Sequence, residues 1–231
     1  KFFTTLENYS NRNNKNDNNK IIYCTDEISQ SNALNLWLSN NREVIKADPL
    51  IDAQFIPWLE SQNEKYKFQR VDSEINDDLE KDSPEIVDKD GKSNTDNIKE
   101  IITKALNNEK VTVKVQSLKN NNAPPALILL PEQMRRINDM GAYMEQKIPG
   151  LPEYHVLLVN KDHPLINGLI KFTDKKIILN EKDSDESSLT GRIANHIYAM
   201  AKLTVGGLDQ KQIVDLQLNN AELLTELLNS N

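Results

Sequence analysis

The side chains that could carry out nucleophilic or metal chemistry are few and scattered in this sequence. Cys24 is the single cysteine and ends an apolar run, so we interpret it as a buried, unreactive thiol. His155, His163 and His196 lie far apart, without the spacing of a zinc site. We expect His163, which precedes Pro164, to fix the start of a helix through a backbone hydrogen bond. None of the 7 glycines forms a phosphate-binding loop. The sequence therefore predicts no catalytic, metal-binding or cofactor-binding residue and no enzymatic activity for this chain.

Composition narrows the class of protein further. The chain has 231 residues, of which 38% are hydrophobic and 27% charged, enough for one large domain or two small ones. A net charge of −7 argues against a nucleic-acid partner, which normally requires a basic surface. No apolar run approaches the roughly 20 residues that span a bilayer, so we expect no membrane partner. One cysteine excludes an internal disulfide and fits a reducing compartment, so we expect a cytoplasmic location. The first methionine is Met134, which suggests a piece of a longer protein.

The first third of the chain alternates strands and helices. This order predicts a small layered α/β unit with a parallel sheet. We expect Phe2 to Tyr9 to be the end of a helix, followed by an asparagine-rich loop. In the next helix, Trp37 and Leu38 should point inward, whereas Trp58 in the one after could be partly exposed. The expected strands are 20–25, 43–47 and 66–71, and the expected helices are 26–38 and 48–59.

A second unit follows after an acidic stretch. We place the first domain at residues 1–74, an exposed acidic linker at 75–94 and a second domain at 95–231. The predicted fold class is α+β, with a three-stranded sheet in the second domain. Strands 111–118 and 126–130 are expected to pair as a hairpin. The other expected elements are a helix at 95–106 capped by Thr95, a helix at 131–147, a strand at 154–159 and a short helix at 165–170.

Two amphipathic helices, 187–203 and 210–229, end the chain and are joined around Gly206 and Gly207. The second helix has two apolar stripes, so it needs two neighbours, and its own domain readily supplies only one. The pattern predicts a homodimer in which the two helix pairs form a four-helix bundle about a two-fold axis. One stripe contains Ile213, Leu216, Leu223 and Leu227, and the other contains Val214, Leu218, Ala221, Leu224 and Leu228. The predicted interface residues are Leu189, Ile193, Ile197, Met200, Ile213, Leu216, Leu223, Leu224 and Leu227.

The predicted helix at 131–147 carries three of the 4 methionines of the chain. Its apolar stripe has two interpretations. Apolar residues at this spacing usually pack into a core. Methionine is also flexible and polarisable, which suits a surface that binds varied apolar partners, so the stripe could contact partly folded chains. The residues of the stripe are Met134, Ile137, Met140, Tyr143 and Met144.

Several segments in order resemble the C-terminal half of the heat-shock protein 90 chaperones, and the bacterial HtpG branch in particular. The segments are 5–9 (TLENY), 20–25 (KIIYCT), 43–47 (EVIKA), 50–59 (LIDAQFIPWL), 125–126 (PA), 134–137 (MRRI), 159–164 (VNKDHP) and 201–207 (AKLTVGG). Two features depart from the family. Lys161 replaces the usual proline of the turn, and Ala53 and Gln54 stand where the family often has an acid followed by an aromatic residue.

The resemblance implies a role for each part of the chain. Residues 1–74 would be the last α/β subdomain of the middle domain, and 95–231 the C-terminal dimerisation domain. The methionine-rich helix would contact client proteins. ATP and magnesium would bind the full-length protein outside this chain, so no cofactor is expected here. The sequence thus predicts a homodimerising, client-contacting fragment of an ATP-dependent chaperone. The alternative is a regulatory or ligand-binding half of a multidomain enzyme, with a small ligand at the strand ends of the α/β unit.

Overall fold

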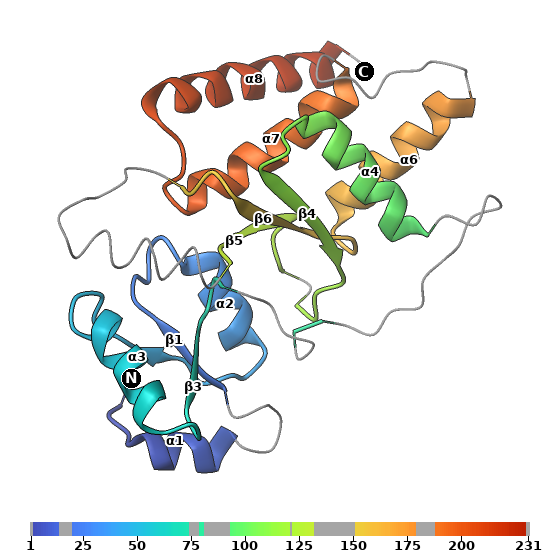
Figure 1. Cartoon of the computed structure of the whole chain (residues 1–231). Helices are drawn as coiled ribbons and strands as arrows, with labels where there is room; N and C mark the ends of the chain where they lie inside the picture. Colours follow the sequence, from blue (N-terminus) through green and yellow to red (C-terminus); the bar gives the residue numbers. More distant parts are fainter. Residues whose placement is uncertain are drawn as a thin grey trace.

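The chain folds into an α+β structure with two three-stranded sheets, as the sequence predicts (Figure 1). The computed structural model describes residues 2–13, 20–73, 79–80, 93–120, 122–131, 151–178 and 188–229. The elements in these residues are α1 (Leu6–Asn13), β1 (Lys20–Cys24), α2 (Ser31–Ser39), β2 (Ile45–Lys46), α3 (Asp52–Gln62), β3 (Lys67–Arg70), α4 (Asn94–Leu106), β4 (Val111–Gln116), β5 (Ala126–Leu129), β6 (His155–Asn160), α6 (Pro164–Ile178), α7 (Leu189–Thr204) and α8 (Gln210–Asn229).

The first sheet has the predicted parallel arrangement. Its strand order is β2-β1-β3, and β1 pairs in parallel with both neighbours. Helix α1 runs on to Asn13 rather than ending near Tyr9. The Tyr9 hydroxyl anchors it to the sheet, because it donates to the carbonyl of Glu43 at 2.8 Å and accepts from the N–H of Ile22 at 3.2 Å. The layered α/β unit is therefore confirmed, with a longer first helix.

Helix α2 begins five residues later than predicted and buries a different leucine. The Asp26 carboxylate accepts the N–H of Ile28 at 3.0 Å, which closes a turn ahead of the helix. Leu36 is buried, whereas Leu38 is 49% exposed, so the prediction of an inward Leu38 was wrong. Trp37 is fully buried, as predicted, and its indole N–H donates to the carbonyl of Val71 at 3.0 Å.

The predicted hairpin in the second sheet is wrong. The strand order is β4-β6-β5, so β6 lies between the two strands that were expected to pair. Strand β6 runs parallel to β4 and antiparallel to β5. Its residues are almost all buried, whereas β4 alternates between buried and exposed residues. Strand β6 therefore takes the centre of the sheet, where both of its edges are paired, and the wholly apolar β5 lies at one edge.

Helix α4 begins at a different cap from the one predicted. The Ser93 hydroxyl accepts the N–H of Asp96 at 3.1 Å, and the Asp96 carboxylate accepts the N–H of Ser93 in return. This reciprocal capping box satisfies two backbone donors at the helix start, so Ser93 rather than Thr95 is the N-cap.

The second sheet is buried on both faces. One face packs against α4, α6 and α7, with Leu157, Ile102 and Ile197 in the same apolar cluster. The other face packs against the first unit, where Leu127 and Leu158 share a second cluster with Trp37. Figure 1 shows α2 between the two sheets, in the place that this shared cluster requires.

Backbone hydrogen bonds reinforce this junction between the two units. The N–H of Leu130 donates to the carbonyl of Asp72 at 3.0 Å, and that of Lys119 donates to the carbonyl of Leu79 at 3.1 Å. Asp72 and Leu79 are buried, so the expectation of an exposed acidic segment does not hold at these positions. The boundaries at residues 74 and 95 stay predictions, but the described parts on either side share one core.

The shared core predicts that both units unfold together. Trp37→Ala should lower the free energy of unfolding by about 3–5 kcal/mol, because it leaves a cavity between the two sheets. Trp58→Ala is the matched control, since Trp58 is 54% exposed and its loss should change stability by less than about 1 kcal/mol. Urea unfolding followed by circular dichroism measures both. Two separate transitions in the wild-type chain, with only one shifted by Trp37→Ala, would contradict the shared core.

Candidate functional site

Local capping signals start both terminal helices and end α7. The Ser188 hydroxyl accepts the N–H of Gly191 at 3.0 Å and starts α7. At the start of α8, the Asp209 carboxylate accepts the N–H of Gln212 at 2.8 Å. Gly206 has φ +68°, a left-handed conformation that favours glycine after a helix. These local signals set the start of both helices and the turn between them.

Mostly polar contacts hold α8 to α7. The Arg192 guanidinium donates to the Glu226 carboxylate at 2.5 Å and to the Glu222 carboxylate at 3.3 Å. At the other end, the Lys202 ammonium donates to the side-chain carbonyl of Gln212 at 3.3 Å. Leu216 is the buried apolar residue of α8 among the described side chains. Among the described side chains, the contacts between the two helices are therefore mainly charged and polar, and one apolar side chain of α8 is buried.

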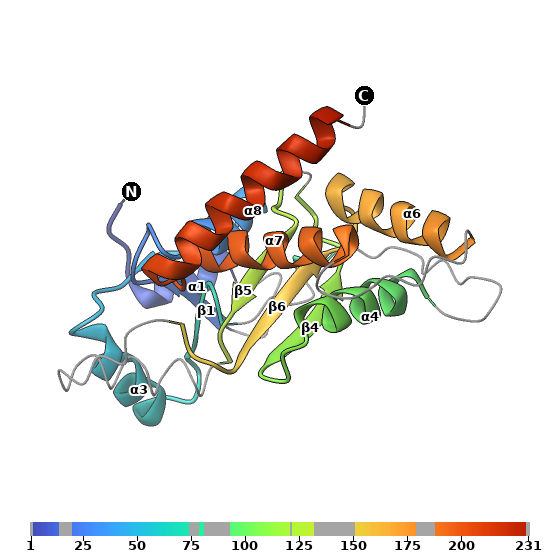
Figure 2. The same ribbon diagram turned by 90° about the horizontal axis from the view of Figure 1, so that it is seen from above.

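An apolar surface of α8 remains uncovered. Figure 1 and Figure 2 together show α8 along α7, on the side away from the second sheet. Several large aliphatic side chains of α8 are between 37% and 76% exposed. We call this surface the open face of α8. It consists of Ile213, Val214, Leu218, Leu224 and Leu228. Met200 and Leu203 of α7 are also exposed. Monomeric proteins rarely expose contiguous apolar surfaces of this kind, which typically mark sites of association.

The predicted interface residues take different places in the structure. Met200, Ile213 and Leu224 are exposed. Leu189, Ile193 and Leu223 are partly buried. Ile197 packs in the core beneath α7 and Leu216 is buried, so these two support the helix pair rather than form its surface. The side chain of Leu227 lies outside the described residues. Val214, Leu218 and Leu228 were not among the predicted interface residues, but they belong to the second predicted stripe and are exposed.

The predicted client-binding stripe lies outside the described residues. This applies to Met134, Ile137, Met140, Tyr143 and Met144, whose role stays a prediction.

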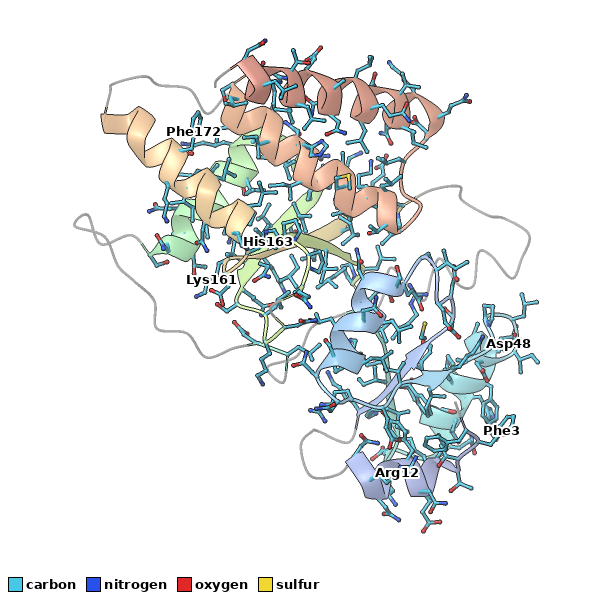
Figure 3. All side chains as sticks on the ribbon, turned by 180° about the vertical axis from the view of Figure 1, so that it is seen from behind. Phe3, Arg12, Asp48, Lys161, His163 and Phe172 are labelled. Carbon is cyan, nitrogen blue, oxygen red and sulfur yellow. The ribbon has the colours of Figure 1, made fainter. Side chains whose placement is uncertain are left out.

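A second apolar surface lies on α3 and the turn before it. The Asp48 carboxylate accepts the N–H groups of Leu50 at 2.9 Å and Ile51 at 3.0 Å, which holds both residues in a surface turn. Phe55 and Trp58 follow on the helix, with ring centroids 5.5 Å apart. We call these four exposed side chains the outer face of α3. Figure 3 shows Asp48 on the side of the first unit that faces away from the second sheet.

The side chains that could do chemistry have structural roles. Cys24 is buried, as predicted, and burial, together with the Asp72 carboxylate, raises its pKa to about 11. His163 accepts the N–H of Leu165 on Nδ1 at 3.1 Å and fixes the start of α6, as predicted (Figure 3). His155 lies between the carbonyl of Pro152 at 2.8 Å and the hydroxyl of Tyr198 at 2.9 Å. Burial lowers the pKa of His155 and raises that of Tyr198 to about 12.

A cavity of about 190 Å³ lies where the carboxyl ends of β1 and β3 meet the second unit. Its polar side chains bind one another. The side-chain carbonyl of Gln30 accepts the N–H groups of Thr25 at 2.9 Å and Asp26 at 3.2 Å. The Arg70 guanidinium forms two hydrogen bonds with the Asp72 carboxylate. These contacts stabilise the junction and do not converge on the cavity as a ligand site would.

Two further features bear on the class of protein. Among the described residues, no three histidine, cysteine or acidic side chains are grouped as a metal site would require. None of the described helices combines the length and the apolar character needed to cross a bilayer.

The sequence is similar to those of several bacterial chaperones. The chaperone protein HtpG of Porphyromonas gingivalis is 30% identical over 178 residues, which cover 73% of this chain and 24% of that protein. The HtpG chaperone of Bacteroides thetaiotaomicron is 28% identical over 182 residues, covering 72% of this chain and 26% of that protein. That of Bacteroides fragilis is 27% identical over 188 residues, covering 74% and 27%. The chain therefore spans about a quarter of the length of the curated relatives it matches. No protein-family model matches it.

These matches support a chaperone family for the chain. Within that class, they confirm the predicted resemblance to the bacterial HtpG branch of the heat-shock protein 90 chaperones, over about three quarters of the chain.

The rate at which a thiol reagent labels Cys24 tests whether this thiol is unreactive. A thiol with a pKa of about 11 carries little thiolate at pH 8, and burial blocks access as well. We expect a thiol reagent to label the native chain more than about a hundredfold slower than the urea-unfolded chain. Absorbance after mixing with an aromatic disulfide measures both rates. Comparable rates in the native and unfolded chains would show a reactive cysteine.

Proposed function

We propose that this chain is a homodimerising, client-binding part of an ATP-dependent molecular chaperone that acts in the cytoplasm. The observation that carries the proposal is the open face of α8, an aliphatic surface at helical spacing that the protomer leaves uncovered. The named relatives supply the chaperone context. Since the chain spans about a quarter of their length, ATP and magnesium binding are assigned to another part of the longer protein, and no reaction is assigned to this chain.

The proposed dimer would cover the exposed aliphatic side chains of α8. A second copy related by a two-fold axis would place the same aliphatic side chains against one another and complete a four-helix bundle. Stable interfaces bury roughly 1,600 Å² in total, a scale that two helix pairs of this length supply. Apolar burial at about 25 cal/mol per Å² would then stabilise the association beyond its entropic cost.

Client binding has a second support besides the methionine-rich stripe. Partly folded chains expose varied apolar side chains, and a surface that binds them must itself be apolar and exposed. The outer face of α3 meets this requirement, with Phe55 and Trp58 adjacent and about half exposed. Aromatic side chains offer a large contact area at a small entropic cost. We therefore assign client contact to this surface together with the stripe from Met134 to Met144.

The alternative of a ligand-binding half of an enzyme finds less support. Its site would be the cavity at the strand ends, but the polar side chains around that cavity are engaged with one another.

Charges on the open face of α8 should dissociate the dimer. Leu218→Glu combined with Leu224→Glu should weaken dimerisation by more than about a hundredfold, because two buried carboxylates per protomer would lack partners. Light scattering at tens of micromolar should give twice 26.4 kDa for the wild-type chain and about 26.4 kDa for the variant.

Lys211→Glu is the matched control, because it lowers the net charge by the same amount on an exposed side of α8 without removing an apolar side chain. This variant should remain dimeric. A monomeric wild-type chain at tens of micromolar would overturn the proposed dimer.

If the outer face of α3 binds clients, substitutions on it should reduce chaperone activity without reducing the stability of the chain. Phe55→Ser with Trp58→Ser should weaken the suppression of client aggregation by roughly threefold or more, while the melting temperature stays nearly unchanged because both side chains are exposed. Turbidity of a heated client protein measures the effect, and Gln62→Ser, further along α3, is the control.

Replacing Met134, Ile137 and Met140 by serine tests the proposed client contact of the methionine-rich stripe. A large fall in melting temperature for that triple variant would favour the core interpretation.

A further inference from the structure

His196 lies in the middle of α7, and its Nδ1 atom is buried. On α7 it follows Leu189 and Ile193 and precedes Met200 and Leu203 at spacings of three and four residues, so it lies in the stripe that ends in the exposed part of α7. Arg192, one turn earlier, contacts the C-terminal half of α8, and Lys202 contacts its first turn. In this antiparallel register, His196 lies near the level of Leu216, the buried apolar residue of α8.

The environment of the His196 ring favours the neutral form. Its Nδ1 atom is buried and has no hydrogen-bond partner among the described residues. A neutral ring with the proton on Nε2 leaves Nδ1 as a bare acceptor, which is tolerable. A protonated ring would place a second N–H donor there without an acceptor, in addition to a charge near Leu216. Burial also lowers the pKa of His196 below its ordinary value.

Charged groups on the neighbouring elements do not offset this preference. On α8, Glu222 and Glu226 pair with Arg192. On α4, the exposed Glu100 pairs with the exposed Lys104. Strand β5 carries no charged residue, and the described side chain of α6 that is charged, Lys171, is exposed. Asp215 of α8 is also exposed, and Lys202 of α7 would repel rather than stabilise a charged imidazole. No described carboxylate is therefore left to pair with a protonated His196.

We propose that His196 makes dimerisation pH-dependent, because its protonation places an unpaired charge in the centre of the helix pair that a second copy covers. The inference rests on the proposed dimer. A charged His196 loosens α8 from α7 and disturbs the open face of α8 on both protomers. The association is then strongest at neutral and alkaline pH and weakens in mild acid.

The sign follows from linkage between proton binding and association. Covering His196 by a second copy buries it further, so its pKa in the dimer lies below its pKa in the free protomer. Above the pKa of the free protomer both states are neutral, and pH has no effect. As the pH falls through that value, the free protomer binds protons that the dimer excludes. With two such histidines per dimer, affinity should fall severalfold to roughly tenfold between pH 7.5 and 5.5, because the pKa of His196 already lies below its ordinary value.

The test is sedimentation equilibrium of the full chain at pH 7.5 and 5.5, with far-UV circular dichroism at each pH to verify the fold. The wild-type chain should show the fall in affinity, whereas His196→Leu should dimerise equally at both pH values. His163→Gln is the matched control, since it removes a partly exposed histidine just before α6, away from the helix pair, and should keep the full pH response. His155 is retained in all three chains, so any response left in His196→Leu measures its contribution.

The outcomes separate the two proposals. A wild-type monomer at both pH values overturns the proposed dimer and this inference with it. A wild-type dimer with the same affinity at both pH values, or a His196→Leu variant with the full wild-type response, overturns the role of His196 and leaves the dimer in place. If His196→Leu does not fold, the pKa values of His196 in the wild-type chain, measured by NMR in dilute and concentrated samples, decide instead. Equal values would overturn the inference.

Discussion

The second sheet is buried on both faces, and the rest of the structure depends on this constraint. Its outer face needs α4, α6 and α7, and its inner face needs Trp37 and the apolar residues around it in the first unit. Because interiors are packed as densely as crystals, such a junction transmits displacement rather than absorbing it. The outer face of α3 and the terminal helices therefore lie on two units that share this core, although they belong to different parts of the chain.

The weak attachment of α8 follows from the chemistry of its contacts. Ion pairs as exposed as those of Glu222 and Glu226 stabilise by about 0–1 kcal/mol each. Burial of Leu216 adds roughly 2 kcal/mol. These contributions orient α8 on α7 but leave most of its apolar area in water. The contacts within the protomer set the position of α8, and the proposed dimer would add to its stability.

The parallel sheet, the buried Trp37 and the buried Cys24 could be predicted because each depends on residues close together in the sequence. The hairpin prediction failed because it assumed that strands adjacent in sequence pair, whereas β6, which follows later in the chain, pairs with both β4 and β5. The shared core brings Trp37 and Leu158 into one apolar cluster, which no local pattern encodes. One signal was present, since the unbroken apolar run of β5 required a cover on each face. At the candidate site, the two stripes of α8 were visible, but their division between α7 and solvent depended on the pairing of Arg192.

The two uncovered apolar surfaces differ in kind, and the difference matches the two proposed partners. The open face of α8 is aliphatic and regular in spacing, so its ridges fit a second helix with the same spacing and favour one geometry. The outer face of α3 combines a turn with two adjacent aromatic rings, which offer broad contact without a fixed register. A regular surface selects a single partner, whereas an irregular aromatic one accepts many. The proposed role of His196 fits this difference. Protonation of one buried ring would disturb the ordered pair of α7 and α8 more than it would disturb an irregular surface such as the outer face of α3.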